Sequence, residues 1–187
     1  PSGSAFSYSN SGTYLLGLII EAASGQTYDQ YLSENVLSPL GLEHTYYNLP
    51  SRVIPHRAEG YTVTENGYDN APLLDPLVPF SAGALASTVQ DIQKYLDAVH
   101  RKNLLGDGIR DTLYTQKRFP DGETNPYALG ALVIRDWEGH RKIAHAGDID
   151  GFSAYMAFYP EEAVSIVVLA NTREVSPTPV GIEQKIA

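Results

Sequence analysis

Cysteine is absent from the 187-residue sequence, and its absence excludes three kinds of chemistry. A chain without thiols forms no disulfide, has no thiolate nucleophile and cannot build a cysteine-ligated zinc site. The five histidines show no His-x-x-x-His pair and no zinc-type spacing with a carboxylate. We therefore expect neither a metal site nor a cofactor.

Basic charge and long hydrophobic runs are also scarce. The sequence has 13 lysines and arginines against 22 aspartates and glutamates, which gives a net charge of −9 at pH 7. This balance disfavours nucleic acid or an anionic membrane surface as the main partner. No apolar run approaches the roughly 20 residues that a membrane-spanning helix requires. We expect no nucleic-acid partner and no membrane span.

The sequence does not start with methionine but opens at Pro1 in a short polar stretch, in the manner of an excerpt from a longer protein. Apolar residues make up 43% of it, which is enough for a globular chain with a real core. We expect residues 1–187 to form a single domain that is part of a larger one.

Residues 1–125 show mostly helical patterns separated by long loops. Apolar residues recur at the i, i+3, i+4, i+7 spacing of one helix face at Leu15, Leu18, Ile19 and Ala22. Neighbouring apolar residues extend this stripe to most faces of the helix. A helix that is apolar on most faces is buried, so the pattern predicts a helix from about residue 11 to 24 through the centre of a helical lobe.

Capping patterns mark two further helices. Thr27 with Gln30, and Ser87 with Gln90, fit the capping box that opens a helix, and the second helix should end near His100. Residues 42–86 show no sustained period and are interrupted by prolines and glycines. A connection of this length is typical of a binding wall or lid.

From residue 126 onward the hydrophobic period changes to two, which predicts strands. One hairpin is expected from strands 131–136 and 142–146, and a second from strands 152–159 and 164–170. The last strand is apolar on both faces, so it should lie inside the sheet with both sides covered. Residues 181–187 favour a helix packed on the sheet. The fold class is therefore α+β: a helical lobe (1–125), then an antiparallel sheet and the start of a C-terminal helix (126–187).

Two places where the chain changes direction carry groups suited to acyl transfer. Tyr8 and Asn10 stand at the start of the long helix, where free N–H groups and the helix dipole favour negative charge. His145 ends a strand and is followed by Gly147, where a substrate backbone can approach and N–H groups can stabilise an oxyanion. Taken singly, residues of these types are more often a packed tyrosine, a helix cap and a structural histidine beside a turn.

The order of the motifs resembles one family closely. Phe-Ser-Tyr-Ser-Asn runs into an apolar helix, and His-Ala-Gly is followed by Gly-Phe-Ser and Val-Val-Leu-Ala-Asn; the matching segments are 6–10, 14–21, 39–42, 83–88, 145–147, 151–153 and 167–171. Together they resemble the serine β-lactamase-related family, which includes class C β-lactamases, D-alanyl-D-alanine carboxypeptidases, D-amino-acid amidases and related esterases. The resemblance implies a β-lactamase/transpeptidase-like fold.

The resemblance also implies roles for individual residues. Tyr8, as the tyrosine of the Tyr-x-Asn motif, would assist proton transfer to and from a catalytic serine, and Asn10 would orient the substrate. His145 and Gly147 would form the third motif, and Asp148 would lend its backbone N–H to the oxyanion hole. An acidic residue at position 148 is a departure that would repel anionic substrates. A histidine at the head of this motif favours the peptidase and esterase branches.

The family's Ser-x-x-Lys motif, which carries the nucleophile, is missing from this sequence. The residues three positions before the five lysines are Asp91, Val99, Tyr114, Gly139 and Ile182. In the family this motif precedes Tyr-x-Asn, so we expect it outside this chain, which alone would lack covalent catalysis. The sheet would then have an open edge that invites pairing with the missing N-terminal segment or with a second chain.

These observations predict part of a serine hydrolase that acts on an amide or ester bond of a small-molecule or peptide substrate, such as a D-peptide, a β-lactam or a small ester. Two alternatives stay open: a non-catalytic homologue that binds peptides or cell-wall fragments or docks a partner, and a dimer paired through exposed strands. The resemblance favours a periplasmic or secreted location.

Overall fold

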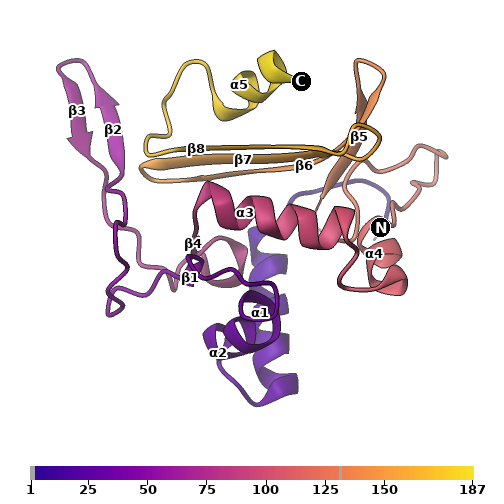
Figure 1. Cartoon of the computed structure of the whole chain (residues 1–187), viewed down its shortest axis with the longest axis horizontal. Coiled ribbons are helices and arrows are strands. Elements are labelled where there is room, and N and C mark those ends of the chain that lie inside the picture. Colours follow the sequence, from indigo (N-terminus) through magenta and orange to yellow (C-terminus); the bar gives the residue numbers. More distant parts are fainter. Residues whose placement is uncertain (1–2, 131) are drawn as a thin grey trace.

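The computed structural model describes residues 3–130 and 132–187, and Ala131, the predicted start of one strand, lies outside them. A four-stranded antiparallel sheet, seen edge-on in Figure 1, lies between two helical layers. The C-terminal helix α5 (Pro179–Ile186) covers one face of the sheet. Helix α3 (Val89–Leu96) covers the other face, with the remaining helices beyond it.

Helix α1 (Asn10–Ser24) begins and ends close to the predicted positions. Gly25 follows it in the left-handed conformation, with φ 72°, and its N–H donates to the carbonyl of Glu21. The N-terminal cap is Ser9, whose side chain accepts a hydrogen bond from the backbone N–H of Gly12 at 3.1 Å. Asn10 is the first residue of the helix, so the reading of Asn10 as the cap is wrong by one residue.

The expected burial of α1 is also wrong. Leu15, Leu16 and Ile19 are 57%, 59% and 60% exposed, and Gly17 is the buried residue of the helix. The apolar stripe is wider than the surface that packs against it in the described residues, namely η2 (Phe80–Ala82) and α2 (Tyr28–Leu32). Helix α1 therefore presents an uncovered apolar face.

The capping patterns had different outcomes. The capping box of Thr27 and Gln30 at the start of α2 is confirmed, and α2 continues as the π-helical turn η1 (Ser33–Leu37). At α3 the cap is Thr88, which accepts from the N–H of Asp91 at 3.2 Å. Ser87 is not the cap because its hydroxyl is engaged with the hydroxyl of Thr45 at 2.8 Å.

Several short elements complete the helical part and the loops. Helix α3 continues into the π-helical turn η3 (Asp97–Arg101), and α4 (Asp107–Leu113) follows it without having been predicted. In the region of long loops, β1 (Tyr46–Tyr47) pairs with β4 (Leu85–Ala86), and β2 (Tyr61–Thr64) pairs with β3 (Gly67–Asn70). The β2–β3 hairpin projects away from the sheet (Figure 1). Among the helices that the structure describes, none combines the length and apolar character needed to cross a membrane.

The predicted hairpins are confirmed in the sheet. Strands β5 (Val133–Trp137) and β6 (His140–Ile149) join at the turn Glu138-Gly139, and β7 (Phe152–Tyr159) pairs with β8 (Val164–Ala170). The strand order is β5-β6-β7-β8. The predicted C-terminal helix is present as α5, and it packs against β7 and β8.

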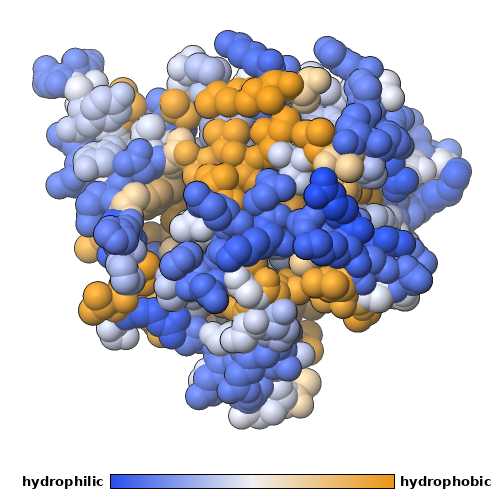
Figure 2. Space-filling view, in the orientation of Figure 1, coloured by the Kyte–Doolittle hydropathy of each residue, from blue (hydrophilic) through white to orange (hydrophobic). Residues whose placement is uncertain are grey.

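Strand β8 is covered on both faces but does not lie inside the sheet. Val167 faces the α3 side and Ile166 the α5 side, while β8 itself is the last strand of the described sheet. Val164 and Leu169 on this strand are 44% and 39% exposed. The apolar pattern of β8 correctly predicted that both faces of the strand are covered. It did not predict the position of β8 in the strand order. Figure 2 shows hydrophobic residues gathered over the sheet, between α5 and α3.

A buried ion pair attaches α5 to the sheet. The ammonium group of Lys142 lies 3.3 and 3.4 Å from the carboxylate oxygens of Glu183, and both side chains are almost fully buried. The hydroxyl of Tyr159 also donates to Glu183, and the Lys142 ammonium lies 4.5 Å from the ring centroid of Trp137. Burial, and then the neighbouring Glu183, raise the pKa of the Tyr159 phenol. Removing one member of such a buried pair costs roughly 3–5 kcal/mol because the other charge stays buried alone.

His100 is a second buried titratable group. Its ring is nearly parallel to those of Tyr114 and Phe158, with centroids 5.6 and 5.3 Å away. Its Nδ1 is hydrogen-bonded to the Tyr114 hydroxyl, and its buried Nε2 has no partner within the described residues. Burial lowers the pKa of His100 from 6.5 to about 4.

This depressed pKa makes stability depend on pH. Between pH 6.5 and 4 the unfolded chain binds a proton at His100 that the folded chain does not, so the free energy of unfolding falls as the pH falls through this range. We expect the contribution of His100 to this loss to be about 3 kcal/mol. Urea unfolding of the wild type and His100→Gln from pH 7 to pH 4 measures the difference in slope. His56→Gln, in an exposed loop, is the control, and equal slopes for the wild type and His100→Gln would contradict the assignment.

Candidate active site

One large cavity brings the predicted site residues together. Its volume is about 2080 Å³, and it lies between the start of α1, the loops of residues 44–60 and 71–88, and the end of β6. All five residues singled out in the sequence line this cavity: Tyr8, Asn10, His145, Gly147 and Asp148. Their chemical roles stay predictions.

Tyr8 and His145 approach each other from opposite ends of the chain. Tyr8 lies two residues before the N-terminus of α1, and His145 lies in β6. Their ring centroids are 6.3 Å apart. Tyr8 is 52% exposed, so its phenol is open to a molecule that enters the cavity.

A third aromatic residue, Tyr127, joins this pair and was not singled out in the sequence. Its hydroxyl lies 3.1 Å from Nε2 of His145, and its ring centroid is 5.9 Å from that of Tyr8 in an edge-on arrangement. Burial, and then the nearby Tyr8, raise the pKa of the Tyr127 phenol. With 13 tyrosines in the chain, residue type alone gave no signal for Tyr127. Its place four residues before the first predicted strand, 131–136, was the available hint.

In the part of the chain that the structure describes, no strand pairs with the edge of β6 beside this aromatic group. Strand β5 pairs with β6 only as far as Val133 opposite Ala144, so residues 145–149 extend beyond β5. A Cβ added at Gly147 would meet nothing within 4 Å. Backbone groups on this side of β6 can therefore pair with an extended substrate or hydrogen-bond to a developing oxyanion.

The charges along this edge are mainly acidic. Asp148 is exposed and forms no ion pair with any of the residues that the structure describes. Asp150 has only a long contact with Arg173, at 3.8 Å. An anionic group that approaches the edge therefore meets at least one uncompensated carboxylate.

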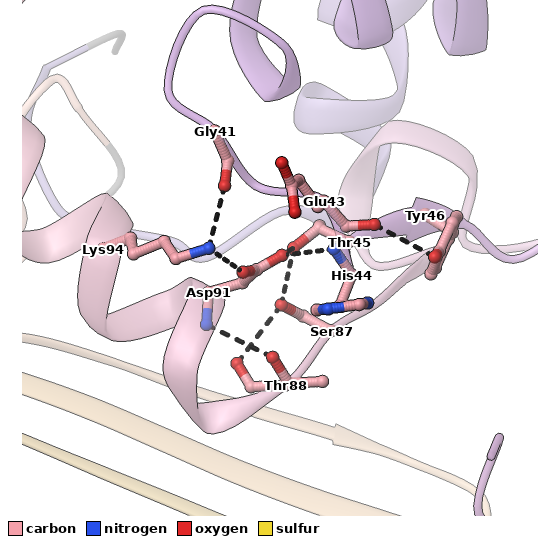
Figure 3. A network of polar contacts seen from close by, with 9 residues as sticks. All are labelled: Gly41, Glu43, His44, Thr45, Tyr46, Ser87, Thr88, Asp91 and Lys94. Carbon is pink, nitrogen blue, oxygen red and sulfur yellow. Dashed lines mark hydrogen bonds and ion pairs between the residues drawn. The ribbon is translucent and has the colours of Figure 1, made fainter. Parts of the chain in front are cut away.

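On the opposite wall of the cavity, the buried carboxylate of Asp91 forms a network of hydrogen bonds that holds the loop around His44 in place, as Figure 3 shows. Its Oδ2 accepts from the backbone N–H of His44 at 2.7 Å and from the hydroxyl of Thr45 at 3.0 Å. Its Oδ1 accepts from Lys94 at 3.1 Å, and Lys94 also donates to the carbonyl of Gly41 at 2.9 Å. Helix α3 thus holds the segment that brings His44 to the cavity.

The hydrogen bonds to Asp91 also decide its protonation. Burial alone would raise the pKa of this carboxyl, but the bonds from His44, Lys94 and Thr45 outweigh burial and lower it. The carboxylate is therefore ionised in the folded protein, and its stabilising bonds persist until the pH falls through the lowered pKa.

A close backbone contact between two glycines joins the loop wall of the cavity to the sheet. Gly60 precedes β2, and Gly151 lies in the turn between β6 and β7 with φ 79°. A Cβ added at Gly151 would lie 2.8 Å from the Cα of Gly60, and one added at Gly60 would lie 3.0 Å from the Cα of Gly151. The two backbones therefore touch at a distance that only glycine permits.

In the described ranges, 3–130 and 132–187, no three histidine, aspartate or glutamate side chains gather in a group that could hold a metal ion.

The Asp91 network predicts a measurable loss of stability. We expect Asp91→Asn to lower the free energy of unfolding by about 3 kcal/mol, because the amide presents N–H groups where the site needs acceptors. Urea denaturation at pH 7 checks this. Asp107→Asn is the matched control because the side chain of Asp107 is 80% exposed, and it should change stability by less than about 0.5 kcal/mol. Equal losses for both variants would refute the role of the network.

Comparison with known proteins adds a family context. A family model described as Beta-lactamase matches residues 1–185. The chain is similar to penicillin-binding protein 4* of Bacillus subtilis (strain 168), with 27% identity over 180 residues, covering 89% of this chain and 40% of that protein. It is also similar to protein flp of Staphylococcus aureus (strain MW2), with 29% identity over 175 residues, covering 90% of this chain and 34% of that protein. The chain thus spans well under half the length of these relatives.

Solved structures share the fold. The octameric penicillin-binding protein homologue from Pyrococcus abyssi superposes with a TM-score of 0.84 at 28% identity, covering 98% of this chain and 42% of that one. The D-amino acid amidase from Ochrobactrum anthropi SV3, solved with D-phenylalanine, gives a TM-score of 0.79 at 21% identity, covering 97% and 59%. At that identity the amidase shows a common fold and nothing more.

Proposed function

The chain belongs to the β-lactamase family, and from this premise we propose that it forms part of a serine hydrolase that cleaves amide or ester bonds through an acyl-enzyme. The predicted family resemblance and the α+β, β-lactamase/transpeptidase-like fold are confirmed. The observation that carries the proposal is the meeting of Tyr8 and His145 on one cavity, with ring centroids 6.3 Å apart.

In the proposed reaction Tyr8 moves the proton of the nucleophile. Its half-exposed phenol lies two residues before the N-terminus of α1 and faces the cavity, where it would act as the proton acceptor. Asn10, the first residue of α1, lines the same cavity and supplies an amide that can both donate to and accept from a substrate amide.

The open edge of β6 would bind the substrate and stabilise the oxyanion. Gly147 leaves room for a substrate backbone beside the strand, and the N–H of Asp148 would donate to the developing oxyanion. His145 borders the same place and would donate a hydrogen bond to the substrate.

We propose that the serine nucleophile comes from polypeptide outside these 187 residues, since the sequence contains no Ser-x-x-Lys motif. Two features support this. The cavity, at about 2080 Å³, is larger than the roughly 300–1,000 Å³ of common ligand sites. Leu15 on the uncovered face of α1 is 57% exposed and lines it, so the cavity has room and apolar surface for a protein segment as well as a substrate.

The outer edge of β8 offers a place for a further strand, from an N-terminal segment or from a second chain. The octameric state of the Pyrococcus abyssi homologue favours the second chain as one occupant. A non-catalytic homologue that binds peptides or cell-wall fragments in the same cavity is the second candidate function, and the missing motif favours it. For the substrate we propose a D-peptide, β-lactam or small ester, and for the location the periplasm or the exterior.

Labelling of the catalytic serine tests the proposed function. The full-length gene product should react with a fluorescent penicillin or a fluorophosphonate at one serine of a Ser-x-x-Lys motif. Tyr8→Phe should slow this labelling by roughly 10²–10⁴-fold, because the proton acceptor is lost. Tyr68→Phe, on the exposed β2–β3 hairpin, is the control and should label at the wild-type rate. No labelling and no ester or D-peptide turnover would instead support the non-catalytic alternative.

The carboxylate of Asp148 predicts a charge preference. Asp148→Asn should raise kcat/KM for an anionic ester by roughly fivefold to tenfold and leave that for a neutral ester of the same size unchanged, because a like charge beside the substrate is removed. Steady-state kinetics with the matched ester pair at low and high salt measures the effect, which should shrink as salt increases. Asp107→Asn controls for net charge. Equal gains for both esters would contradict this preference.

A further inference from the structure

Tyr127 contacts His145 through both its hydroxyl and its ring. Its hydroxyl lies 3.1 Å from Nε2 of His145, and its ring packs on Phe6 with centroids 4.9 Å apart and against Tyr8 at 5.9 Å. The sequence motifs assign it no role, and the proposed function does not use it.

The backbone of Tyr127 is held on both sides. Its N–H donates to the side-chain oxygen of Asn125 at 3.0 Å, and it forms an antiparallel bridge with Val133. The next residue, Ala128, donates to the carbonyl of Leu132 at 2.8 Å. Because the backbone and the ring are both fixed, the hydroxyl reaches His145 from one direction.

The direction of this hydrogen bond follows from the two partners. Burial, and then Tyr8, raise the pKa of the Tyr127 phenol, so the phenol keeps its proton at neutral pH. The only polar contact of the hydroxyl in the described part of the chain is Nε2 of His145. A phenol donates more readily than it accepts, and an unprotonated imidazole nitrogen is a good acceptor. If the phenol donates, Nε2 is the acceptor and the proton of the neutral ring is on Nδ1.

We propose that Tyr127 is a positioning residue that holds the neutral imidazole of His145 in its Nδ1–H tautomer by donating a hydrogen bond to Nε2. This inference rests on the proposed function for its catalytic meaning, since it specifies how His145 takes part. With Nε2 occupied, His145 offers a hydrogen-bond donor through Nδ1, and acceptance of the serine proton is left to Tyr8. The two predicted catalytic residues thereby have different tasks.

Other ionisable side chains surround His145. Tyr8 and Tyr127 contact it directly. The charged side chains on the same cavity are Arg57, Glu59, Asp148, Asp150 and Arg173. For this reason the tautomer of the neutral ring is a more specific measurement than its pKa.

Nitrogen NMR of protein labelled with ¹⁵N-histidine tests the tautomer directly. His145→Gln identifies the signals of His145. Above the titration range, the wild type should show Nδ1 protonated and Nε2 unprotonated, and Tyr127→Phe, which retains the ring packing on Phe6, should shift the balance toward Nε2–H. Tyr114→Phe is the matched control, because it removes a phenol from His100 and should leave His145 unchanged. A wild-type ring protonated at Nε2, or identical His145 spectra in the wild type and Tyr127→Phe, would overturn the inference.

Kinetics of the full-length protein separates positioning from a merely structural role. Tyr127→Phe should lower kcat about tenfold and leave KM and thermal stability at wild-type values, while Tyr127→Leu should lower stability as well. An unchanged kcat in Tyr127→Phe would overturn the catalytic meaning of the hydrogen bond. The NMR measurement needs no turnover, so an inactive full-length protein would count against the proposed function and leave the tautomer result intact.

Discussion

The overhang of β6 beyond β5 is the constraint on which the candidate site depends. Among the described residues, pairing between the two strands stops at Val133 and Ala144, and β6 has no partner on that side from His145 to Ile149. Strand β7 pairs with the whole of this extension, so one side of it is hydrogen-bonded while no described strand pairs with its other side. A backbone edge that is open, ordered and beside a glycine provides what acyl-transfer chemistry requires: fixed N–H groups that need no reorganisation when charge develops.

The two walls of the cavity are held by different forces. On the loop side, the carboxylate of Asp91 joins His44, Thr45 and Lys94 through charge-assisted hydrogen bonds in the protein interior. On the other side, Tyr8 and Tyr127 approach His145 through ring packing and one hydrogen bond. The first wall is therefore sensitive to protonation, and the second to the shape of its aromatic rings. Substitutions that unfold the loops and substitutions that disturb the chemistry should be separable for this reason.

Local patterns were sufficient where local physics decides the outcome. The long helix, the capping box at Thr27 and both hairpins of the sheet follow from periodicity, caps and turns, and the structure confirms them. The order of the motifs also predicted that Tyr8 and His145 would line one cavity. The division into a helical lobe and a sheet region at residue 125 stays a prediction, as do the roles of the site residues.

The predictions that failed depended on contacts with residues distant in sequence, and a local hydrophobic period carries no information about such contacts. The apolar stripe of α1 predicted burial, but burial requires a covering surface, and Leu16 and Ile19 lack one in the described residues. The apolar faces of β8 predicted an interior strand, although cover by α3 and α5 says nothing about pairing along its edge. Ser87 lost the capping role because Thr45, distant in sequence, engages its hydroxyl. Tyr127 was not predicted because its contact with His145 forms only in the folded protein, and no local sequence pattern indicates it.

The contact between Gly60 and Gly151 has a consequence for how this cavity can diversify. The loop wall touches the β6–β7 turn backbone to backbone, so a side chain at either position would push the wall away from the strand edge. Ile54, Leu73 and Val78 also line the cavity but are not part of that contact. Exchanges at these apolar positions can therefore change which ligands fit the cavity, while the contact between the two glycines keeps the loop wall aligned with the strand edge.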